Sequence, residues 1–279
     1  MKCAWQELLN ILPLWMRREV DSLGKENLQE LRLRTGYPPE LRLSDNRILL
    51  RREVAQSDIA FCMNTASQYS PWAAQSCVSG YITAAGGHRI GICGEVVVEH
   101  RQIRSMKKIR SLCIRVARDF PGIAAGIKNL SGSALIIGPP GYGKPTLLRD
   151  LIRQSSAFRQ QTVAVVDERG ELFPDGIFDP GPSTDVLSGC AKAYGLDMLL
   201  RTMGPDMIAV DEITAEEDCD ALIRAGNCGV RLLATCHAAG PEDLLHRPVY
   251  QKLVGSGLFS TLVILQRDKS FTLERMVRI

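Results

Sequence analysis

The sequence predicts an α/β protein in which a domain with a largely parallel sheet, residues 126–279, follows a smaller α+β domain, residues 1–125. Two observations predict this arrangement. After residue 125, short apolar runs alternate with helical segments, which is the pattern of a parallel sheet covered on both faces. Before it, Gly-punctuated strand patterns follow an amphipathic helix, and Pro121-Gly122 opens a connecting segment.

The composition is that of a globular protein large enough for two cores, since 45% of its 279 residues are hydrophobic and 23% are charged. A net charge of +3 does not demand a nucleic-acid partner, although residues 101–118 hold a local excess of Arg and Lys. Nine cysteines without a C-x-x-C pair indicate reduced thiols. The N-terminal stretch lacks a secretory pattern, and the uncharged residues 59–87 are too polar to span a bilayer, so we expect a cytoplasmic protein.

The N-terminal half begins with apolar residues at helical spacing over residues 5–16, where Pro13 is expected to break the helix. Packing within the domain explains this pattern. A membrane-surface or partner helix is the alternative, but its polar face is not strongly basic. Residues 28–50 alternate around a TGYPPE turn and predict a hairpin, and residues 79–98 predict two strands joined by a Gly-Gly turn, followed by a helix or a strand pair.

The C-terminal half contains apolar runs that predict buried parallel strands, separated by helical stretches. The predicted strands are residues 134–137, 162–167, 207–211, 231–236 and 262–266, with helices over residues 147–154 and 218–225.

A Gly-rich segment, SALIIGPPGYGKPTLLRD, places a strand, a turn and a helix in the order that a phosphate-binding loop requires. Its glycines permit backbone conformations in which N–H groups converge on phosphate oxygens. Lys144 would neutralise the β- and γ-phosphates, and the helix start adds its positive dipole end. The predicted nucleotide-binding residues are Gly138, Pro139, Pro140, Gly141, Tyr142, Gly143, Lys144, Pro145 and Thr146, with ATP and Mg²⁺ as cofactors.

Pro145 departs from the motif G-x-x-x-x-G-K-[ST], because it stands where a Ser or Thr hydroxyl normally holds Mg²⁺. Taken alone, the loop is also compatible with an ordinary Gly-rich turn before a helix. The downstream residues favour the phosphate-binding interpretation, while Pro145 leaves ATP hydrolysis an open question.

Acidic residues follow the predicted strand at residues 207–210, where Asp211 and Glu212 stand side by side. One carboxylate at such a strand end can hold Mg²⁺ through water while its neighbour polarises the attacking water. A solvated helix cap is the alternative for such a pair. Its position downstream of the loop favours the catalytic interpretation.

Two further predicted strands end in polar groups, Asp167, Glu168 and Glu171 after one strand, and Thr235 and His237 after the other. In a parallel sheet the carboxyl ends of the strands meet at one edge, so we expect these side chains to converge with the loop. A single His after a strand is often structural. Here we expect His237 to sense the γ-phosphate region.

The motifs GPPGYGK, DERGE, PDMIAVDE and ATCHA, in this order and spacing, resemble the type II/IV secretion-ATPase superfamily. The segments LRLRTGYPPELRL, GGHRIGICGEVV, IRSLCIRVAR, DVLSGCAKA and LLRTMGPDMIAVDEI together resemble, within that superfamily, the stage III sporulation protein AA family of endospore-forming bacteria. This resemblance covers nearly the whole chain and implies a RecA-like P-loop core.

The resemblance further implies a mother-cell ATPase, peripheral at the cytoplasmic face of a membrane, that docks on membrane-embedded sporulation or secretion-like proteins. It implies a homo-oligomeric ring, a hexamer, in which one subunit lends arginines of its N-terminal domain to its neighbour's nucleotide. Arg89 and Arg115 match those arginines, and Arg201 is a weaker candidate. A surface ion pair is the alternative for each.

The leading hypothesis is therefore an ATP-driven motor that takes no small-molecule substrate besides its nucleotide. Glu212 would position the water, Asp211 would hold Mg²⁺ through water, Lys144 would clamp phosphate, and Glu168 would polarise the γ-phosphate region. One rival is a nucleotide-dependent scaffold with little hydrolysis, which Pro145 favours. The other is a nucleic-acid motor, which needs a basic channel with aromatic residues, and only the Arg- and Lys-rich stretch hints at one.

Overall fold

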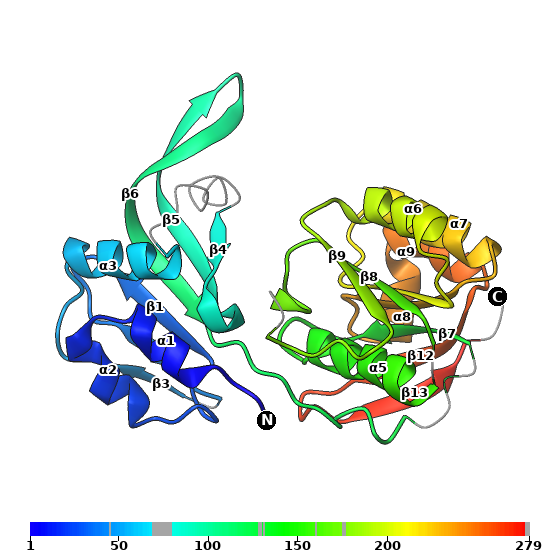
Figure 1. Ribbon diagram of the computed structural model, residues 1–279, viewed down its shortest axis with the longest axis horizontal. Coiled ribbons are helices and arrows are strands. Elements are labelled where there is room, and N and C mark those ends of the chain that lie inside the picture. The colour runs from blue at the N-terminus through cyan, green and yellow to red at the C-terminus, as the bar shows by residue number, and fades with distance from the viewer. Residues whose placement is uncertain are drawn as a thin grey trace. The chain divides into compact units, whose positions relative to one another are not determined.

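The computed structural model describes residues 1–44, 46–68, 80–127, 130, 132–159, 161–174 and 177–276. The chain divides into two compact units, Met1–Asp119 and Phe120–Ile279 (Figure 1). The division lies slightly before residue 125, because the backbone N–H groups of Gly122 and Ala124 donate to the carboxylate of Asp150 in the second unit. Among the described residues, no helix has the length and apolar character needed to cross a membrane.

The N-terminal unit is built on an antiparallel sheet with the strand order β3-β2-β1-β6-β5-β4. Its strands are β1 (Glu30–Arg34), β2 (Glu40–Arg42), β3 (Arg47–Leu49), β4 (Tyr81–Thr83), β5 (Arg89–Glu99) and β6 (Gln102–Arg115). Its helices are α1 (Trp5–Ile11), α2 (Leu14–Asp21) and α3 (Gln56–Ala66), and a short 3-10 turn, η2 (Ala85–Gly87), joins β4 to β5. The expected helix break is present, since Pro13 stands immediately before α2.

One face of this sheet forms the core of the unit and the other carries charge. Along β1, Leu31 and Leu33 are fully buried and pack with apolar residues of the helices, such as Leu8 and Met16. Because side chains alternate along a strand, the neighbouring position Glu30 stands on the opposite face of the sheet. The N-terminal helix is therefore a core element.

His88 ties the β4–β5 connection to two distant segments. Its ring is fully buried, with Nε2 2.9 Å from the backbone O of Ala4 and Nδ1 accepting the N–H of Ala117 at 3.1 Å. Burial lowers the pKa of His88 below its usual range, against the hydrogen bond to Ala4. Gly86, at φ 79°, packs so closely that a Cβ there would lie 2.6 Å from the Cβ of Ala4.

The second unit contains a largely parallel sheet with the strand order β13-β12-β7-β11-β10-β8-β9, in which only the β12–β13 pair is antiparallel. Its strands are β7 (Ser133–Ile137), β8 (Val163–Asp167), β9 (Thr184–Ser188), β10 (Met207–Val210), β11 (Arg231–Cys236), β12 (Phe259–Leu265) and β13 (Phe271–Arg275). Its helices are α5 (Lys144–Arg159), α6 (Lys192–Thr202), α7 (Glu216–Asn227), α8 (Pro241–His246) and α9 (Pro248–Gly255).

Helices cover both faces of this sheet, with α5 on one face and α6, α7 and α9 on the other (Figure 1). This placement follows from right-handed crossovers, because the chain moves one way across the sheet through α5 and the other way through α6 and α7. Strands β7, β8 and β10 are buried along their whole length, as their continuous apolar sequences predict. All five predicted strands are present, and the predicted fold class is confirmed.

Candidate nucleotide-binding site

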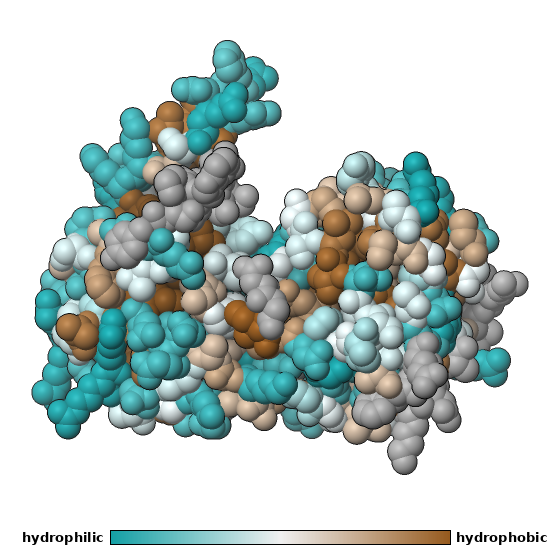
Figure 2. All heavy atoms as spheres, viewed as in Figure 1, coloured by the Kyte–Doolittle hydropathy of each residue, from teal (hydrophilic) through white to brown (hydrophobic). Residues whose placement is uncertain are grey.

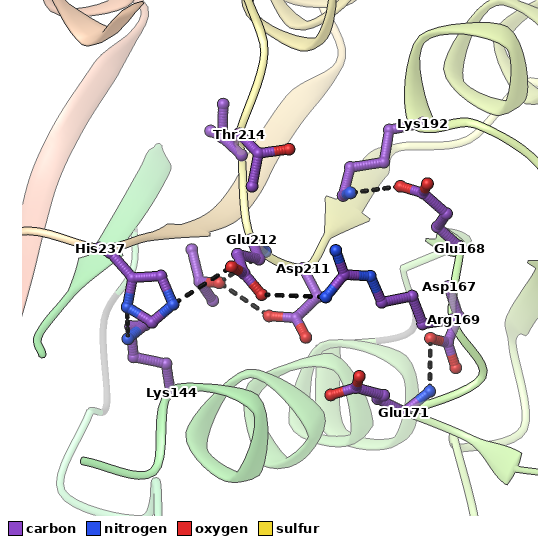
Figure 3. A network of polar contacts seen from close by, with 12 residues as sticks. Lys144, Asp167, Glu168, Arg169, Glu171, Lys192, Asp211, Glu212, Thr214 and His237 are labelled. Carbon is purple, nitrogen blue, oxygen red and sulfur yellow. Dashed lines mark hydrogen bonds and ion pairs between the residues drawn. The ribbon is translucent and has the colours of Figure 1, made fainter. Parts of the chain in front are cut away.

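The site lies at the carboxyl edge of the parallel sheet, where five adjacent strands end (Figure 3). Lys144 follows β7, His237 follows β11, Asp211 and Glu212 follow β10, Glu168 follows β8, and Lys192 follows β9. The topology therefore brings together side chains that lie far apart along the chain.

The Gly-rich loop between β7 and α5 has the backbone that its glycines predict. Gly141 and Gly143 have φ values of 80° and 97°, a region that residues with a Cβ rarely adopt. A Cβ on Gly138 would lie 3.2 Å from the Cβ of Leu265, so the loop also starts at a tight approach between strands. Helix α5 then begins with the N–H of Leu147 donating to the O of Gly143 at 3.0 Å.

Lys144 is held inside this loop, with 4% of its surface exposed. Its Nζ donates to the backbone O of Gly138 at 2.6 Å and of Pro139 at 3.1 Å, and it lies 2.7 Å from Nδ1 of His237. Burial lowers the pKa of Lys144, whereas the nearby carboxylate of Asp211 raises it. The three donors of the ammonium are thus all engaged within the protein.

His237 connects the loop lysine to Glu212. Because an ammonium group only donates, Nδ1 of His237 accepts from Lys144, and the ring proton resides on Nε2. That nitrogen lies 3.3 Å from Oε1 of Glu212. The polar chain Lys144–His237–Glu212 therefore spans three strand ends, as Figure 3 shows.

Glu212 has an uncommon backbone conformation, with φ at 45°. A residue other than glycine in this region carries strain of about 1 kcal/mol or more. Thr235 supports the strained turn, because its Oγ1 accepts the N–H of Glu212 and its backbone O accepts the N–H of Ile213, both at 2.8 Å. The turn directs the Glu212 carboxylate toward His237 and toward Arg169, whose Nη1 lies 3.9 Å from Oε2.

Asp211 is linked to Glu212 through the same threonine. The hydroxyl of Thr235 donates to Oδ1 of Asp211 at 2.8 Å while it accepts from the Glu212 backbone. Burial raises the pKa of Asp211, and the hydrogen bond from Thr235 opposes that shift. Thr235 thus holds both acidic residues in place. In the sequence, its position at the end of a predicted strand was the only signal of such a role.

The DERGE segment divides between structural and site-facing residues. The carboxylate of Asp167 accepts three backbone N–H groups of the following turn, from Glu171, Leu172 and Phe173, each at 2.9 Å. Asp167 therefore shapes its own loop. Glu168 pairs with Lys192 at 2.5 Å, and it is Arg169 that contacts Glu212.

Three cations near this edge were not predicted from the sequence. Lys192 is 5% exposed at the start of α6, and it follows β9, whose TDVLS sequence has only a weak strand pattern. Lys269, in the β12–β13 turn, donates to the O of Gly141 at 2.5 Å. Arg169 lies inside a recognised motif, but only the fold shows that its side chain reaches Glu212.

The residues after Lys144 bear on metal binding. Pro145 is the second residue of α5, a position where a missing N–H costs the helix nothing. Thr146 lies one residue later, about 100° around the helix, so its hydroxyl is not in the position of the missing one, and its Oγ1 accepts from Nη2 of Arg149 at 3.5 Å. Within the described residues, no cluster of three His, Cys, Asp or Glu side chains could hold a metal ion by itself. Asp211 and Glu212 suit a hydrated Mg²⁺ that also binds phosphate oxygens.

The two candidate arginines of the N-terminal unit are direct neighbours. Arg89 on β5 is paired with Arg115 on β6, and Arg115 is paired in turn with Glu30 on β1. These residues therefore form a row across three strands on the charged face of the sheet. The guanidinium of Arg89 stacks 3.9 Å from the ring centroid of Tyr81, and Nε of Arg115 lies 3.7 Å from Glu30.

Glu30 is the acidic centre of this row, with 8% of its surface exposed. It also accepts from Nε of Arg32 at 2.5 Å. Burial alone would raise the pKa of Glu30, but hydrogen bonds from Arg32 and Cys113 lower it overall. Arg201, the weaker candidate, lies exposed in the last turn of α6.

The model of the family described as "Sporulation stage III, protein AA" matches residues 3–274. The chain belongs to this family. The stage III sporulation protein AA of Bacillus subtilis is 34% identical over 94% of this chain and 91% of its own length. An uncharacterised protein, ycf45, of Porphyra purpurea is 27% identical over 92% of this chain, which spans 45% of that longer protein. The family resemblance expected from the sequence motifs is thus confirmed.

Solved structures place this member of the stage III AA family in the RecA-like secretion-ATPase fold. The ATPase DotB of Legionella pneumophila superposes with a TM-score of 0.63 at 18% identity, over 95% of this chain and 80% of DotB. The pilus retraction motor PilT, solved with ADP, superposes with a TM-score of 0.59 at 15% identity, over 92% of this chain and 79% of PilT. At these identities the likeness concerns the fold.

Proposed function

We propose that this stage III AA family protein is an ATP-binding motor subunit of a sporulation-associated membrane complex, and that Pro145 slows its hydrolysis of ATP. The observation that carries the proposal is the polar chain Lys144–His237–Glu212 beside Asp211, at the mouth of a Gly-rich loop. The loop supplies backbone donors for phosphate, and the acids supply groups for metal and water. The ATPase fold of DotB and PilT supports this assignment.

Each residue of the site has a separate task in this proposal. The backbone N–H groups of the loop, which the prolines at 139, 140 and 145 lack, bind the phosphates, and Lys144 exchanges its bonds to loop carbonyls for phosphate oxygens. Asp211 holds Mg²⁺ through water, and that ion neutralises charge that develops on the phosphates. Glu212, held by Thr235 and facing His237, orients the attacking water. Glu168 polarises the γ-phosphate region from its pair with Lys192.

We further propose a homo-oligomeric ring, a hexamer, in which Arg89 and Arg115 of one subunit reach the nucleotide of its neighbour. Their position next to each other in one cross-strand row supports this role, because two guanidinium groups held side by side form a site for anions. The ring would act peripherally at the cytoplasmic face of a membrane on membrane-embedded proteins. Nucleotide-dependent changes between the two units would transmit the motion.

The decisive experiment compares Glu212→Gln with the wild-type chain in ATP binding and in turnover. We expect ATP affinity to change less than about threefold and turnover to fall at least about a hundredfold, because the group that orients water is lost. Glu217→Gln, at an exposed position in the first turn of α7, is the matched control and leaves turnover unchanged. Equal turnover of Glu212→Gln and wild type would exclude Glu212 as the water-positioning residue.

Pro145 favours a second candidate function, a nucleotide-dependent scaffold that assembles on binding ATP and scarcely hydrolyses it. The proline removes both a hydroxyl ligand for Mg²⁺ and a backbone N–H donor. Assembly followed by light scattering, with ATP and with a non-hydrolysable analogue, separates the two functions. A scaffold assembles equally with both nucleotides and shows no turnover, whereas a motor turns over ATP in the assembled state.

A further inference from the structure

The strands β5 and β6 continue together well beyond the rest of the N-terminal sheet (Figure 1). In the described part of the chain, strand β4 pairs with β5 as far as Gly91, and β1 pairs with β6 as far as Ser111. Farther out, β5 and β6 pair with each other and, among the described residues, with no third strand. We call residues 94–110 the β5–β6 ribbon.

The direction of this ribbon is set where it leaves the sheet. The register shifts between Cys93 and Glu95, and Lys108 on the opposite strand has a φ of 40°. A Cβ on Gly94 would lie 2.7 Å from the O of Lys108 and 2.9 Å from the Cα of Ile109, so only glycine fits under this bulge. The bulge and its glycine therefore fix the direction in which the ribbon projects from the sheet.

The tip of the ribbon places a cation in a strained turn. His100 and Arg101 connect the paired residues Glu99 and Gln102, and their φ values are 50° and 63°. Two-residue turns with both central residues in this region usually contain Asn or Gly. A His-Arg turn accepts backbone strain, which is commonly retained where the side chains have a function.

One face of the ribbon exposes apolar side chains. The pairs Val96–Met106 and Val98–Ile103 lie directly opposite each other, so all four stand on the same face. The exposed fractions of Val96, Val98 and Ile103 are 45%, 56% and 43%. Met106 is half-buried and packs against the domain core, whereas the three valine and isoleucine side chains are exposed. The apolar face thus runs from the core to the tip.

Basic side chains surround this apolar face. The ribbon contains Arg101, Arg104, Lys107, Lys108 and Arg110 against Glu95 and Glu99, a net charge of +3, which equals the net charge of the whole chain. Its ion pairs, such as Arg110–Glu95 at 2.6 Å and Arg104–Glu99 at 3.7 Å, join exposed groups and contribute little. Figure 2 shows hydrophilic side chains over most of the ribbon with hydrophobic ones between them.

We propose that the β5–β6 ribbon docks this protein on an anionic lipid surface. Val98 and Ile103 enter the headgroup region, and the Lys and Arg side chains contact the anionic headgroups. The composition of the ribbon favours a lipid surface over nucleic acid or another protein as its partner. Residues 94–110 contain no Phe, Tyr or Trp, the side chains on which nucleic-acid bases mainly stack, and protein interfaces are enriched in these residues and depleted in Lys.

The test uses the full chain and co-sedimentation with vesicles of phosphatidylglycerol and phosphatidylcholine in equal parts, compared with vesicles of phosphatidylcholine alone. We expect binding to the anionic vesicles only, with weaker binding as salt is raised. The triple variant Arg101→Gln, Arg104→Gln, Lys107→Gln should bind roughly a hundredfold more weakly, since each cation contributes about fivefold.

A charge-matched control separates the ribbon from net charge. The triple variant Arg18→Gln, Lys25→Gln, Arg51→Gln removes the same charge at exposed positions elsewhere in the unit and should bind like wild type within about threefold. A second ribbon variant, Val98→Thr with Ile103→Thr, should lower affinity at least about fivefold at unchanged charge. Circular dichroism checks folding, and if the ribbon triple unfolds, Arg101→Gln alone should lose about fivefold.

Three results would overturn the proposal. The first is equal binding of the ribbon triple and the control triple, which would indicate a general charge effect. The second is failure of the wild-type chain to bind anionic vesicles. The third is binding to DNA or to a membrane protein in detergent that the ribbon variants abolish while vesicle binding stays unchanged. None of these results bears on nucleotide binding. The tests of lipid docking are therefore independent of the proposed motor function.

Discussion

The Nζ atom of Lys144 lies 2.7 Å from Nδ1 of His237, although 93 residues separate them in the chain. The other nitrogen of the same ring faces Glu212 at 3.3 Å. A phosphate group entering the loop would compete with His237 for the lysine, and the ring could then shift relative to Glu212. This contact therefore gives a physical route from phosphate binding to Glu212, the residue proposed to position the water.

Replacing His237 by Ala should uncouple these two events. We expect nucleotide affinity to change less than about threefold, since Lys144 remains in the loop to bind phosphate, while turnover falls about ten- to a hundredfold because Glu212 loses its partner. Calorimetry and steady-state turnover measure the two effects. The exposed His246 provides the control His246→Ala. A large loss of affinity with normal turnover per bound nucleotide would contradict this role.

Removing the loop lysine should abolish nucleotide binding or weaken it severely. In Lys144→Ala the triphosphate loses a desolvated charge that backbone amides cannot replace, so we expect a loss of at least about a hundredfold in affinity. Lys252→Ala is the control, because Lys252 pairs with Asp220 at an exposed site on α9. Unchanged ATP affinity of Lys144→Ala in calorimetry would refute the assignment of the phosphate-binding loop.

Pro145→Thr should raise Mg²⁺-dependent ATPase activity. Threonine restores a hydroxyl for Mg²⁺ and an N–H for phosphate, and we expect at least a tenfold gain, or about 1.4 kcal/mol of transition-state stabilisation. Pro248→Thr is the control, because it makes the same substitution in the first turn of another helix, α9. Equal rates of Pro145→Thr and wild type, with and without Mg²⁺, would mean that water or Asp211 already holds the metal.

The arginine row should matter only between subunits. Arg89→Ala or Arg115→Ala should lower turnover about a hundredfold or more in the assembled state and leave the low activity of dilute monomers unchanged. Arg18→Ala, an exposed arginine on helix α2 and therefore not in the strand row, serves as the control. Size-exclusion chromatography at two protein concentrations defines the two states. Equal losses in monomers would refute action across a subunit boundary.

The N-terminal unit should lose stability as the pH falls below about 6.5. Burial lowers the pKa of His88 in the folded state, so on acidification the unfolded chain binds a proton before the folded chain does. The contribution of neutral His88 to stability is therefore fully present above the pKa of the unfolded state and is lost as the pH falls below it. Protonation also places a proton on the nitrogen that accepts the N–H of Ala117.

Hydrogen exchange at the Ala117 amide measures this effect locally. After correction for its intrinsic pH dependence, we expect faster exchange at pH 5 than at pH 7.5. In His88→Gln this difference should shrink. The free energy of unfolding should also fall by about 1–3 kcal/mol at both pH values, because the contacts of the ring are broken. The exposed His246→Gln should leave the difference intact. Identical protection of Ala117 at both pH values would show that His88 does not control stability.

Local sequence patterns determined the parallel-sheet core and the backbone of the Gly-rich loop. Continuous apolar runs predicted β7, β8 and β10, because a strand buried on both faces has no polar position. Glycines predicted the loop, because residues with a Cβ rarely adopt the positive φ values of Gly141 and Gly143. Edge strands lack these signals: β9 is half-buried and β13 is largely exposed, and neither was predicted.

The tertiary structure alone decided which polar side chains meet. Asp167 was expected at the ligand edge, yet its carboxylate binds three N–H groups of its own turn, and no spacing in the sequence distinguishes these fates. Likewise, the Arg89–Arg115 pair depends on strand register, and the Lys144–His237 contact depends on β7 and β11 being neighbours. Sequence periodicity reports the burial of single elements, whereas crossovers and register, which arise from the packing of the whole sheet, place distant residues together.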